Sequence, residues 1–288
     1  MTAVRAGACN IETLKEIARK IRVLSLQMTT QAESGHPGGC LSAADIIAVL
    51  YFYKMHLGPD KRPEPKWPER DRFVLSKGHA CPAQYAALHL LGLIPEQELM
   101  RLRQINSMLQ GHPDRKTPGI ETISGTLGQG FSVACGMALA AKIDGKNYKV
   151  YVVLGDGETQ EGIVWETAMF AGHHKLNNLV AIIDHNKCQN DGYIKDILDI
   201  KPLAEKFRAF NWNVLEIDGH NIKEIIYALD KADKSKKPFA IIAHTIKGKG
   251  VSFMENRPEW HGKALSKEQL AVALKELEDE HGNKRGAN

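Results

Sequence analysis

Apolar positions in the first part of the chain recur at steps of three and four residues. From Ile11 to Ala32 they form one stripe, which is typical of an amphipathic helix. The glycine- and proline-rich segment 34–39 is predicted to end this helix, because neither residue type continues a helix well. A second helix is predicted to begin at Ser42, a good N-cap residue followed three positions later by Asp45, and to end near Met55.

Short, uninterrupted apolar runs alternate with helical patterns through the rest of the chain. The predicted strands are 73–75, 148–154, 179–184, 214–217 and 239–244. The predicted helices among and after them include 128–141, 221–232 and a last helix from Ser266, where Gln269 completes a capping box. Apolar strands that alternate with helices favour a parallel sheet buried on both faces. The predicted fold class is therefore α/β, a mostly parallel sheet with helices on both faces.

The body of the chain is predicted to be one domain, residues 1–265, because no linker divides it. Within it, residues 11–55 supply the N-terminal helices and a loop that we expect to face a substrate. Residues 266–288 are predicted to form a C-terminal helical extension. A chain of 288 residues is long enough to bury a large core in one such domain.

The composition disfavours several classes of protein. Apolar residues make up 43% of the chain, yet no run approaches the roughly 20 apolar residues of a membrane span, and the N-terminus lacks the apolar core of a secretory signal. The net charge of +4 is too small to indicate a nucleic-acid-binding protein. Five cysteines without paired spacing are typical of reduced thiols, so we expect a cytoplasmic protein that binds neither membranes nor nucleic acid.

The most informative chemical pattern lies at the ends of two predicted strands. Gly155-Asp156-Gly157 follows the strand that ends at Leu154, and Asn186 follows the next strand, 30 positions after Asp156. The carboxyl ends of parallel strands lie at one edge of the sheet, where open α/β sheets bind ligands. Two oxygen donors beside glycines that admit a phosphate are typical of a Mg²⁺–diphosphate site.

Four histidines stand beside glycine in predicted loops: His36, His79, His112 and His261. Imidazoles exchange protons with hydroxyls and carbonyls near neutral pH, which carbon–carbon bond chemistry on sugars requires. A neighbouring glycine lets the backbone turn each ring into a cleft.

These segments together resemble the transketolase family. The Gly-Asp-Gly…Asn pattern is similar to the thiamine diphosphate signature, and the histidines lie in SGHPGG, RFVLSKGHA, GHPDRKTPGIETISGTLGQG and EWHG, which are similar to transketolase segments in the same order. The resemblance extends from about residue 11 to 265. It implies the diphosphate-binding domain of the thiamine diphosphate fold, with thiamine diphosphate and Mg²⁺ as cofactors, and Ca²⁺ or Mn²⁺ as possible substitutes for Mg²⁺.

The resemblance also implies roles for individual residues. The metal ligands would be the side chains of Asp156 and Asn186 and the backbone carbonyl of Cys188, although an aliphatic residue is more usual at this last position. The four histidines would be catalytic and would line the channel to the reactive carbon. Glu161 would lie in a subunit interface, and Lys77 would lie near the diphosphate. The cofactor-binding residues would be His79, Gly125, Leu127, Gly155, Asp156, Gly157, Glu161, Asn186, Lys247 and His261.

Transketolases are much longer than this chain, and the sequence matches only their first domain. The resemblance therefore implies the N-terminal subunit of a split transketolase, which transfers a two-carbon ketol unit from a ketose phosphate to an aldose phosphate. It would be active only with a C-terminal subunit that binds the pyrimidine ring, and we expect two copies of each. The partner would supply the glutamate that protonates the pyrimidine and most of the arginines that hold the sugar phosphate.

Three alternatives remain open. The chain could be a subunit of another thiamine diphosphate enzyme, either deoxyxylulose phosphate synthase-like or 2-oxo acid dehydrogenase-like, although four histidines exceed what a pyruvate-derived donor needs. A ketol transferase for a specialised sugar, sulfonated or branched, is a second alternative. A non-catalytic scaffold subunit is the third, and the intact Asp156, Asn186 and histidines argue against it.

Overall fold

The structure is a computed structural model that describes residues 9–285. Within these residues, five parallel strands form one sheet and a short antiparallel hairpin stands apart from it. Across the sheet the order is β1 (Arg72–Leu75), β2 (Val150–Gly155), β3 (Leu179–His185), β7 (Phe239–His244) and β6 (Asn213–Asp218). All five predicted strands are present, and their ends lie within two residues of the predicted ones. The predicted α/β class is confirmed.

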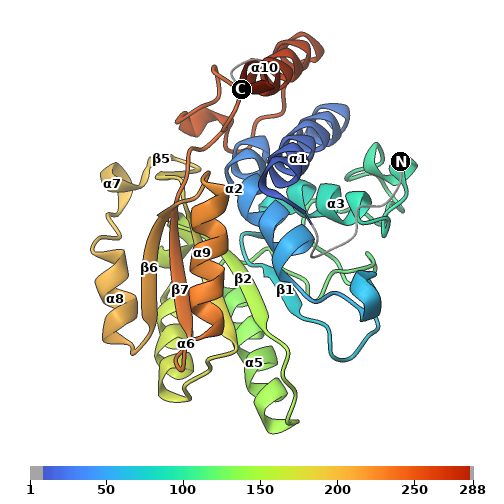
Figure 1. Cartoon of the computed structure of the whole chain (residues 1–288). Coiled ribbons are helices and arrows are strands. Elements are labelled where there is room, and N and C mark those ends of the chain that lie inside the picture. The colour runs from blue at the N-terminus through green and yellow to red at the C-terminus, as the bar shows by residue number, and fades with distance from the viewer. Residues whose placement is uncertain (1–8, 286–288) are drawn as a thin grey trace.

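Helices cover both faces of the sheet (Figure 1). One face packs against α1 (Ile11–Gln31), α2 (Pro37–Val49), α3 (Cys81–Leu90) and α9 (Ile222–Asp233), and the other against α5 (Gln129–Ile143), α6 (Gly162–His173) and α8 (Leu203–Ala209). Successive residues of a strand point to opposite faces, so the apolar run of β3 divides between two cores. Val180 and Ile182 lie in the first core, and Ala181 and Ile183 lie in the second.

The second helix begins earlier than predicted. The sequence pattern predicts a start at Ser42, but α2 begins at Pro37 and His36 precedes it. Proline is well tolerated in the first turn of a helix, because the backbone N–H that it lacks has no partner there in any case. Ser42 lies inside the helix, where its hydroxyl donates a hydrogen bond to Asp184 Oδ2 at 2.7 Å. The helix ends at Val49, and one π-helical turn, η1 (Leu50–Lys54), continues it.

The last helix, α10 (Lys267–Arg285), has the predicted capping box. Ser266 N donates to Gln269 Oε1 at 2.9 Å, and Gln269 N donates to Ser266 Oγ at 3.2 Å. In Figure 1, α10 lies beside α1, away from α5, and its Ala273 and Leu277 are buried. The final residues of the predicted extension, 286–288, lie outside the described residues.

Several short elements connect the main ones. They are η2 (Pro59–Lys61), η3 (Gly78–Ala80), α4 (Glu96–Leu99), η4 (Gly157–Gln160), β4 (Cys188–Gln189), β5 (Gly192–Tyr193), α7 (Ile194–Ile197) and η5 (Pro258–Trp260). Among the residues described, no helix is both long and apolar enough to cross a bilayer. All five cysteines are free thiols.

Candidate functional site

Asp156 and Asn186 lie at neighbouring tips of the sheet, directly after β2 and β3. Asp156 Oδ2 accepts a hydrogen bond from Lys187 N at 2.5 Å, and its Oδ1 accepts one from Gly157 N at 2.9 Å. Asn186 Oδ1 accepts one from Cys188 N at 3.1 Å. Both side chains are buried, so these bonds join the loops after the two strands into one polar floor.

This floor belongs to a cavity of about 390 Å³ at the carboxyl edge of the sheet. Every residue predicted for the site lines it: His36, His79, His112, Gly125, Leu127, Gly155, Asp156, Gly157, Glu161, Asn186, Cys188, Lys247 and His261. Lys77 lines it as well. The fold thus brings residues from eight separate segments of the chain to the carboxyl edge of the sheet, where parallel sheets bind ligands.

Three of the histidines form a compact cluster. The ring centroids of His36 and His79 are 5.1 Å apart, those of His79 and His261 are 5.1 Å apart, and those of His36 and His261 are 5.4 Å apart. His36 Nδ1 is buried without a hydrogen-bond partner among the described residues. A buried ring nitrogen of this kind is available to a ligand.

The histidine rings are neutral at physiological pH. Burial, together with the nearby Arg103, lowers the pKa of His36 to about 4, and burial beside Lys247 lowers the pKa of His261 to about 3. Burial also places the pKa of His79 well below its usual value, and burial and Arg103 lower that of His112. A neutral imidazole has one nitrogen that donates and one that accepts, so each ring can serve either role toward a substrate.

Lys77 is held by a buried carboxylate that the sequence did not single out. Its ammonium pairs with Asp184 and donates to Gly39 O at 3.1 Å. Asp184 also accepts hydrogen bonds from the hydroxyls of Ser42 and Thr245, and from Asn186 Nδ2 at 3.2 Å. Burial raises the pKa of Asp184, but the Lys77 charge and the hydrogen bonds from Lys77, Thr245 and Ser42 together outweigh it, and the pKa lies below its usual value. The only signal in the sequence is a charged residue at the end of an apolar strand.

Lys247 is a second buried amine in the cavity. Its Nζ lies 2.7 Å from His261 Nδ1 and 3.5 Å from Cys188 O. Burial, with a contribution from Lys77, lowers the pKa of Lys247 to about 8. Two lysines that line one cavity favour an anionic group there, because an anion offsets the buried charge of Lys247, to which the charge of Lys77 adds.

Asp156, Asn186 and the Cys188 carbonyl give three oxygen donors at one edge of the cavity. Burial and the neighbouring Asp184 raise the pKa of Asp156 to about 7. A divalent cation beside this carboxylate would offset its charge, and oxygen atoms are the donors that hard cations prefer. Among the side chains that the structure describes, no group of three or more His, Cys, Asp or Glu is arranged to hold a metal. The donor set thus suits a cation that shares its ligands with a phosphate.

Glu158 is a second residue that the sequence did not single out. Its buried carboxylate accepts hydrogen bonds from Ser76 Oγ, from Gly128 N at 2.8 Å and from Gly155 N at 2.9 Å. These contacts join the end of β1, the start of α5 and the end of β2. Glu161, by contrast, is exposed at the cavity rim, and its side chain makes no cap hydrogen bond to α6.

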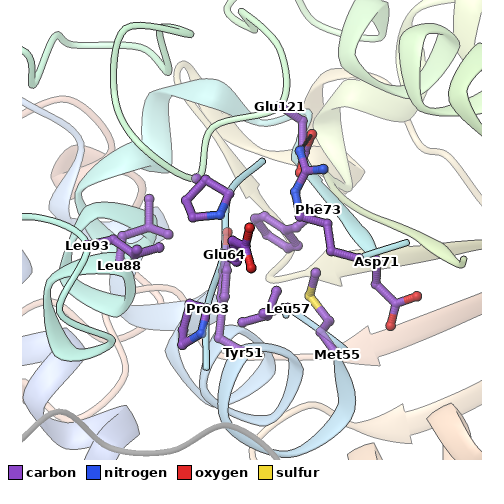
Figure 2. A pocket seen from close by; sticks show the side chains of 13 residues that line it. Tyr51, Met55, Leu57, Pro63, Glu64, Asp71, Phe73, Leu88, Leu93 and Glu121 are labelled. Atoms are coloured by element: carbon purple, nitrogen blue, oxygen red, sulfur yellow. Dashed lines mark hydrogen bonds and ion pairs between the residues drawn. The ribbon is translucent and has the colours of Figure 1, made fainter. Parts of the chain in front are cut away.

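A second cavity lies away from these residues (Figure 2). It holds about 20 Å³ and lies between η1 and β1, with Tyr51, Met55, Phe73 and Leu88 in its walls. Its polar rim includes Arg70, which donates to Glu121 Oε2 at 2.7 Å. None of the predicted site residues lines this space, and its volume suits little more than one water molecule.

Comparison with known proteins places this arrangement in a family. Residues 13–282 match the model of the thiamine diphosphate-binding domain of transketolase. The 6-deoxy-6-sulfo-D-fructose transketolase subunit of Clostridium sp. strain MSTE9 is 47% identical over 269 residues, which cover 93% of this chain and 97% of that subunit. An apulose-4-phosphate transketolase subunit of Phocaeicola vulgatus is 42% identical over 93% of this chain and 95% of that subunit.

Longer transketolases match over part of their length. Human transketolase is 44% identical over 270 residues, which cover 93% of this chain and 42% of the human protein. The crystal structure of the Campylobacter jejuni transketolase superposes with a TM-score of 0.89 at 38% identity, with 94% of this chain and 43% of that one covered. The chain thus spans less than half the length of these relatives and nearly all of the two subunits. By sequence and by structure, it belongs to the transketolase family, as a thiamine diphosphate-binding domain.

Proposed function

We propose that this chain is the N-terminal subunit of a split transketolase and transfers a two-carbon ketol unit between sugar phosphates together with a C-terminal partner. The observation that carries this proposal is the single cavity in which the four histidines, the three oxygen donors and two buried lysines meet. The near-complete coverage of two relatives that are named as transketolase subunits, 97% and 95%, supports the split arrangement.

Thiamine diphosphate would bind with its diphosphate at the carboxyl edge of the sheet. Asp156, Asn186 and the Cys188 carbonyl would hold Mg²⁺, and Lys247 would offset the remaining phosphate charge. The backbone at Gly125 and Leu127 would lie against the cofactor. When bound, thiamine diphosphate supplies a nucleophilic carbon and an electron sink for carbon–carbon cleavage.

The histidines of this chain would handle protons and orient the sugar. His36, His79 and His261 lie within 5.4 Å of one another by ring centroid, so a ketose in the cavity would meet all three. Because the rings are neutral, one can accept a proton from a sugar hydroxyl while another donates to a carbonyl oxygen. His112 would contact a hydroxyl nearer the mouth of the cavity.

The partner would complete the site. A cavity open on one side cannot exclude water from a reactive carbanion, and we propose that the C-terminal subunit closes it and contributes the acid that activates the pyrimidine. We further propose an assembly of two copies of each protein in the cytoplasm. Glu161, at the exposed rim, would face that partner.

Reconstitution tests the proposal. The chain is mixed with a candidate C-terminal subunit, Mg²⁺ and thiamine diphosphate, and ketol transfer is measured from fructose 6-phosphate to an aldose phosphate. We expect transfer from the mixture and none from either protein by itself. Transfer by this chain alone, or no transfer by any stable complex that binds the cofactor, would refute the split-subunit proposal.

The preferred donor substrate distinguishes the proposed function from the alternative enzyme functions. The same complex is supplied with fructose 6-phosphate, 6-deoxy-6-sulfofructose, apulose 4-phosphate or pyruvate. A preference for the sulfonated or apulose donor would assign a specialised ketol transferase, which the names of the two relatives favour. Turnover of pyruvate alone would assign a different thiamine diphosphate enzyme.

A further inference from the structure

Two histidines outside the proposed active site face each other at the tips of β3 and β7. His185 and His244 are the last residues of these strands and are direct partners in the parallel pairing. Their Nδ1 atoms are 3.1 Å apart. The neighbouring strand β6 places Glu216 Oε2 at 3.0 Å from His244 Nε2. None of these three side chains lines the cavity described above.

The hydrogen-bond network fixes which ring nitrogens carry protons. An ionised carboxylate can only accept, so we assign the proton of His244 to Nε2, where it is donated to Glu216. Nδ1 of His244 then has a free lone pair, and His185 donates to it from Nδ1–H. When the His185 proton moves to Nε2 of the same ring, both Nδ1 lone pairs point into the space between the rings.

The separation of the two nitrogens suits a shared metal ion. Metal–nitrogen bonds are about 2.0–2.1 Å long. Two imidazole nitrogens bound to one ion are therefore about 2.9 Å apart when the nitrogen–metal–nitrogen angle is a right angle, and about 3.4 Å apart when it is tetrahedral. The observed 3.1 Å falls between these values. A carboxylate behind a histidine is the usual outer partner of a metal-bound imidazole, because it fixes the tautomer and raises ligand basicity.

The pair is also reachable from solvent. The side chain of His244 is 41% exposed and that of Glu216 is 47% exposed. Since the residues described hold no group of three or more suitable side chains, water would fill the remaining coordination positions. Imidazole nitrogens favour Zn²⁺, Ni²⁺ and Cu²⁺ over Mg²⁺, which prefers oxygen donors.

We propose that His185 and His244 chelate one divalent transition-metal ion through their Nδ1 atoms, with Glu216 orienting His244. The proton of His185 moves from Nδ1 to Nε2, so binding releases no net proton. This site is separate from the oxygen-donor set at Asp156 and Asn186, and it takes a different class of metal.

Calorimetric titration of the untagged chain with Ni²⁺, in excess Mg²⁺, tests the proposal. We expect one site, with affinity at least tenfold weaker in His185→Gln and in His244→Gln. Glu216→Gln should weaken binding by about 10- to 100-fold, as loss of an outer partner usually does. The control is His173→Gln, from the exposed pair His173–His174, whose perpendicular rings have centroids 5.0 Å apart; binding should not change.

Electron paramagnetic resonance with one equivalent of Cu²⁺ counts the ligands directly. The unsubstituted chain should show hyperfine coupling to two imidazole nitrogens and each single variant to one, with thermal unfolding used to confirm that the variants are folded. Fewer than two coupled nitrogens in the unsubstituted chain would overturn the proposal. If both histidine variants bind Ni²⁺ with the affinity of the unsubstituted chain, the proposal is overturned as well.

Discussion

Asp184 shows how one buried carboxylate organises a polar site within an apolar sheet. It receives four hydrogen-bond donors, from Lys77, Ser42, Thr245 and Asn186. Lys77 and Asp184 are 1% and 0% exposed in their side chains, so neither charge has water as an alternative partner. The pair therefore fixes the position of an amine in the cavity and, through Asn186, that of a proposed metal ligand.

Removing one member of this pair should be costly. Lys77→Met leaves the Asp184 charge buried without a cation, and we expect the free energy of unfolding to fall by about 3–5 kcal/mol. Urea denaturation measures the change. Lys195→Met, at an exposed position on α7, serves as the control and should change stability by less than about 0.5 kcal/mol. Equal stability of the Lys77 and Lys195 variants would mean that the buried pair contributes nothing.

Asp156 is expected to matter for cofactor binding and not for folding. Its pKa is raised to about 7 by burial and by Asp184, so its charge is unfavourable without a cation. Asp156→Asn should weaken Mg²⁺-dependent binding of thiamine diphosphate by roughly tenfold or more, because a charged ligand is lost. The variant removes an unfavourable buried charge but leaves one backbone donor, Lys187 N or Gly157 N, without an acceptor, so the two effects on stability oppose each other and the thermal midpoint should change little. Asp191→Asn, at an exposed residue of the same cavity, is the matched control. Unchanged affinity in the Asp156 variant would argue against its role as a ligand.

His36 predicts a pH dependence of stability. Its pKa is lowered from 6.5 to about 4 in the folded protein, so between these pH values the unfolded chain binds a proton that the folded chain does not. The contribution of His36 to the free energy of unfolding is therefore fully present above pH 6.5 and decreases as the pH falls toward 4. We expect the thermal midpoint to fall less between pH 7 and 4.5 in His36→Gln than in the unsubstituted chain. Parallel curves for the two proteins would contradict the lowered pKa.

Some of these residues could be predicted from the sequence, and others could not. Asp156 and Asn186 follow apolar strands, and the topology of parallel sheets alone brings such positions together. The histidines stand beside loop glycines, which makes them visible as motifs. Asp184 is marked only as a charged residue at the end of an apolar strand, and Glu158 stands in no recognisable motif. Their partners come from distant segments, so only tertiary contacts explain these buried charges.

At the scale of elements, strands were easier to predict than helix ends. A strand buried on both faces is apolar throughout, so its sequence marks its limits, as in β7. The predicted start of α2 at Ser42 was wrong because the prediction relied on the capping preference of serine. The helix begins at Pro37, and the Ser42 hydroxyl inside it donates a hydrogen bond to Asp184. The difference has a consequence for the site, since the first turn of α2 places Gly39 against Lys77.

Glu158 connects three elements, so its loss should affect how they join. In Glu158→Gln, one carboxylate oxygen becomes an NH₂ group that cannot accept from Gly128 N or Gly155 N. We expect the free energy of unfolding to fall by about 1–3 kcal/mol, the usual cost of a buried donor without an acceptor. Hydrogen exchange should show faster exchange at the start of α5 and the end of β2 and little change in α9. If the exchange rates in Glu158→Gln equal those in the unsubstituted chain, the Glu158 carboxylate does not join the three elements.

At the scale of the molecule, the proposed assembly needs a surface where two copies of this chain meet. The helices α5 and α6, which lie on the same side of the sheet in Figure 1, carry exposed apolar side chains: Val133 is 39%, Met169 54% and Phe170 42% exposed. Exposed apolar groups that gather on neighbouring helices mark association surfaces, and a symmetric dimer uses the same patch twice.

Met169→Asp tests this surface directly. A charge at the centre of a self-complementary contact meets its own copy across the symmetry axis, and two like charges that lose water oppose association. Sedimentation velocity of the chain, alone and with its partner, should therefore show a shift toward the species that contain one copy. Tyr227→Asp, equally exposed at 54% but on α9 at the opposite face of the sheet, should leave the distribution unchanged. If the Met169 variant keeps the mass of the unsubstituted assembly while the Tyr227 variant loses it, the contact lies on the α9 side.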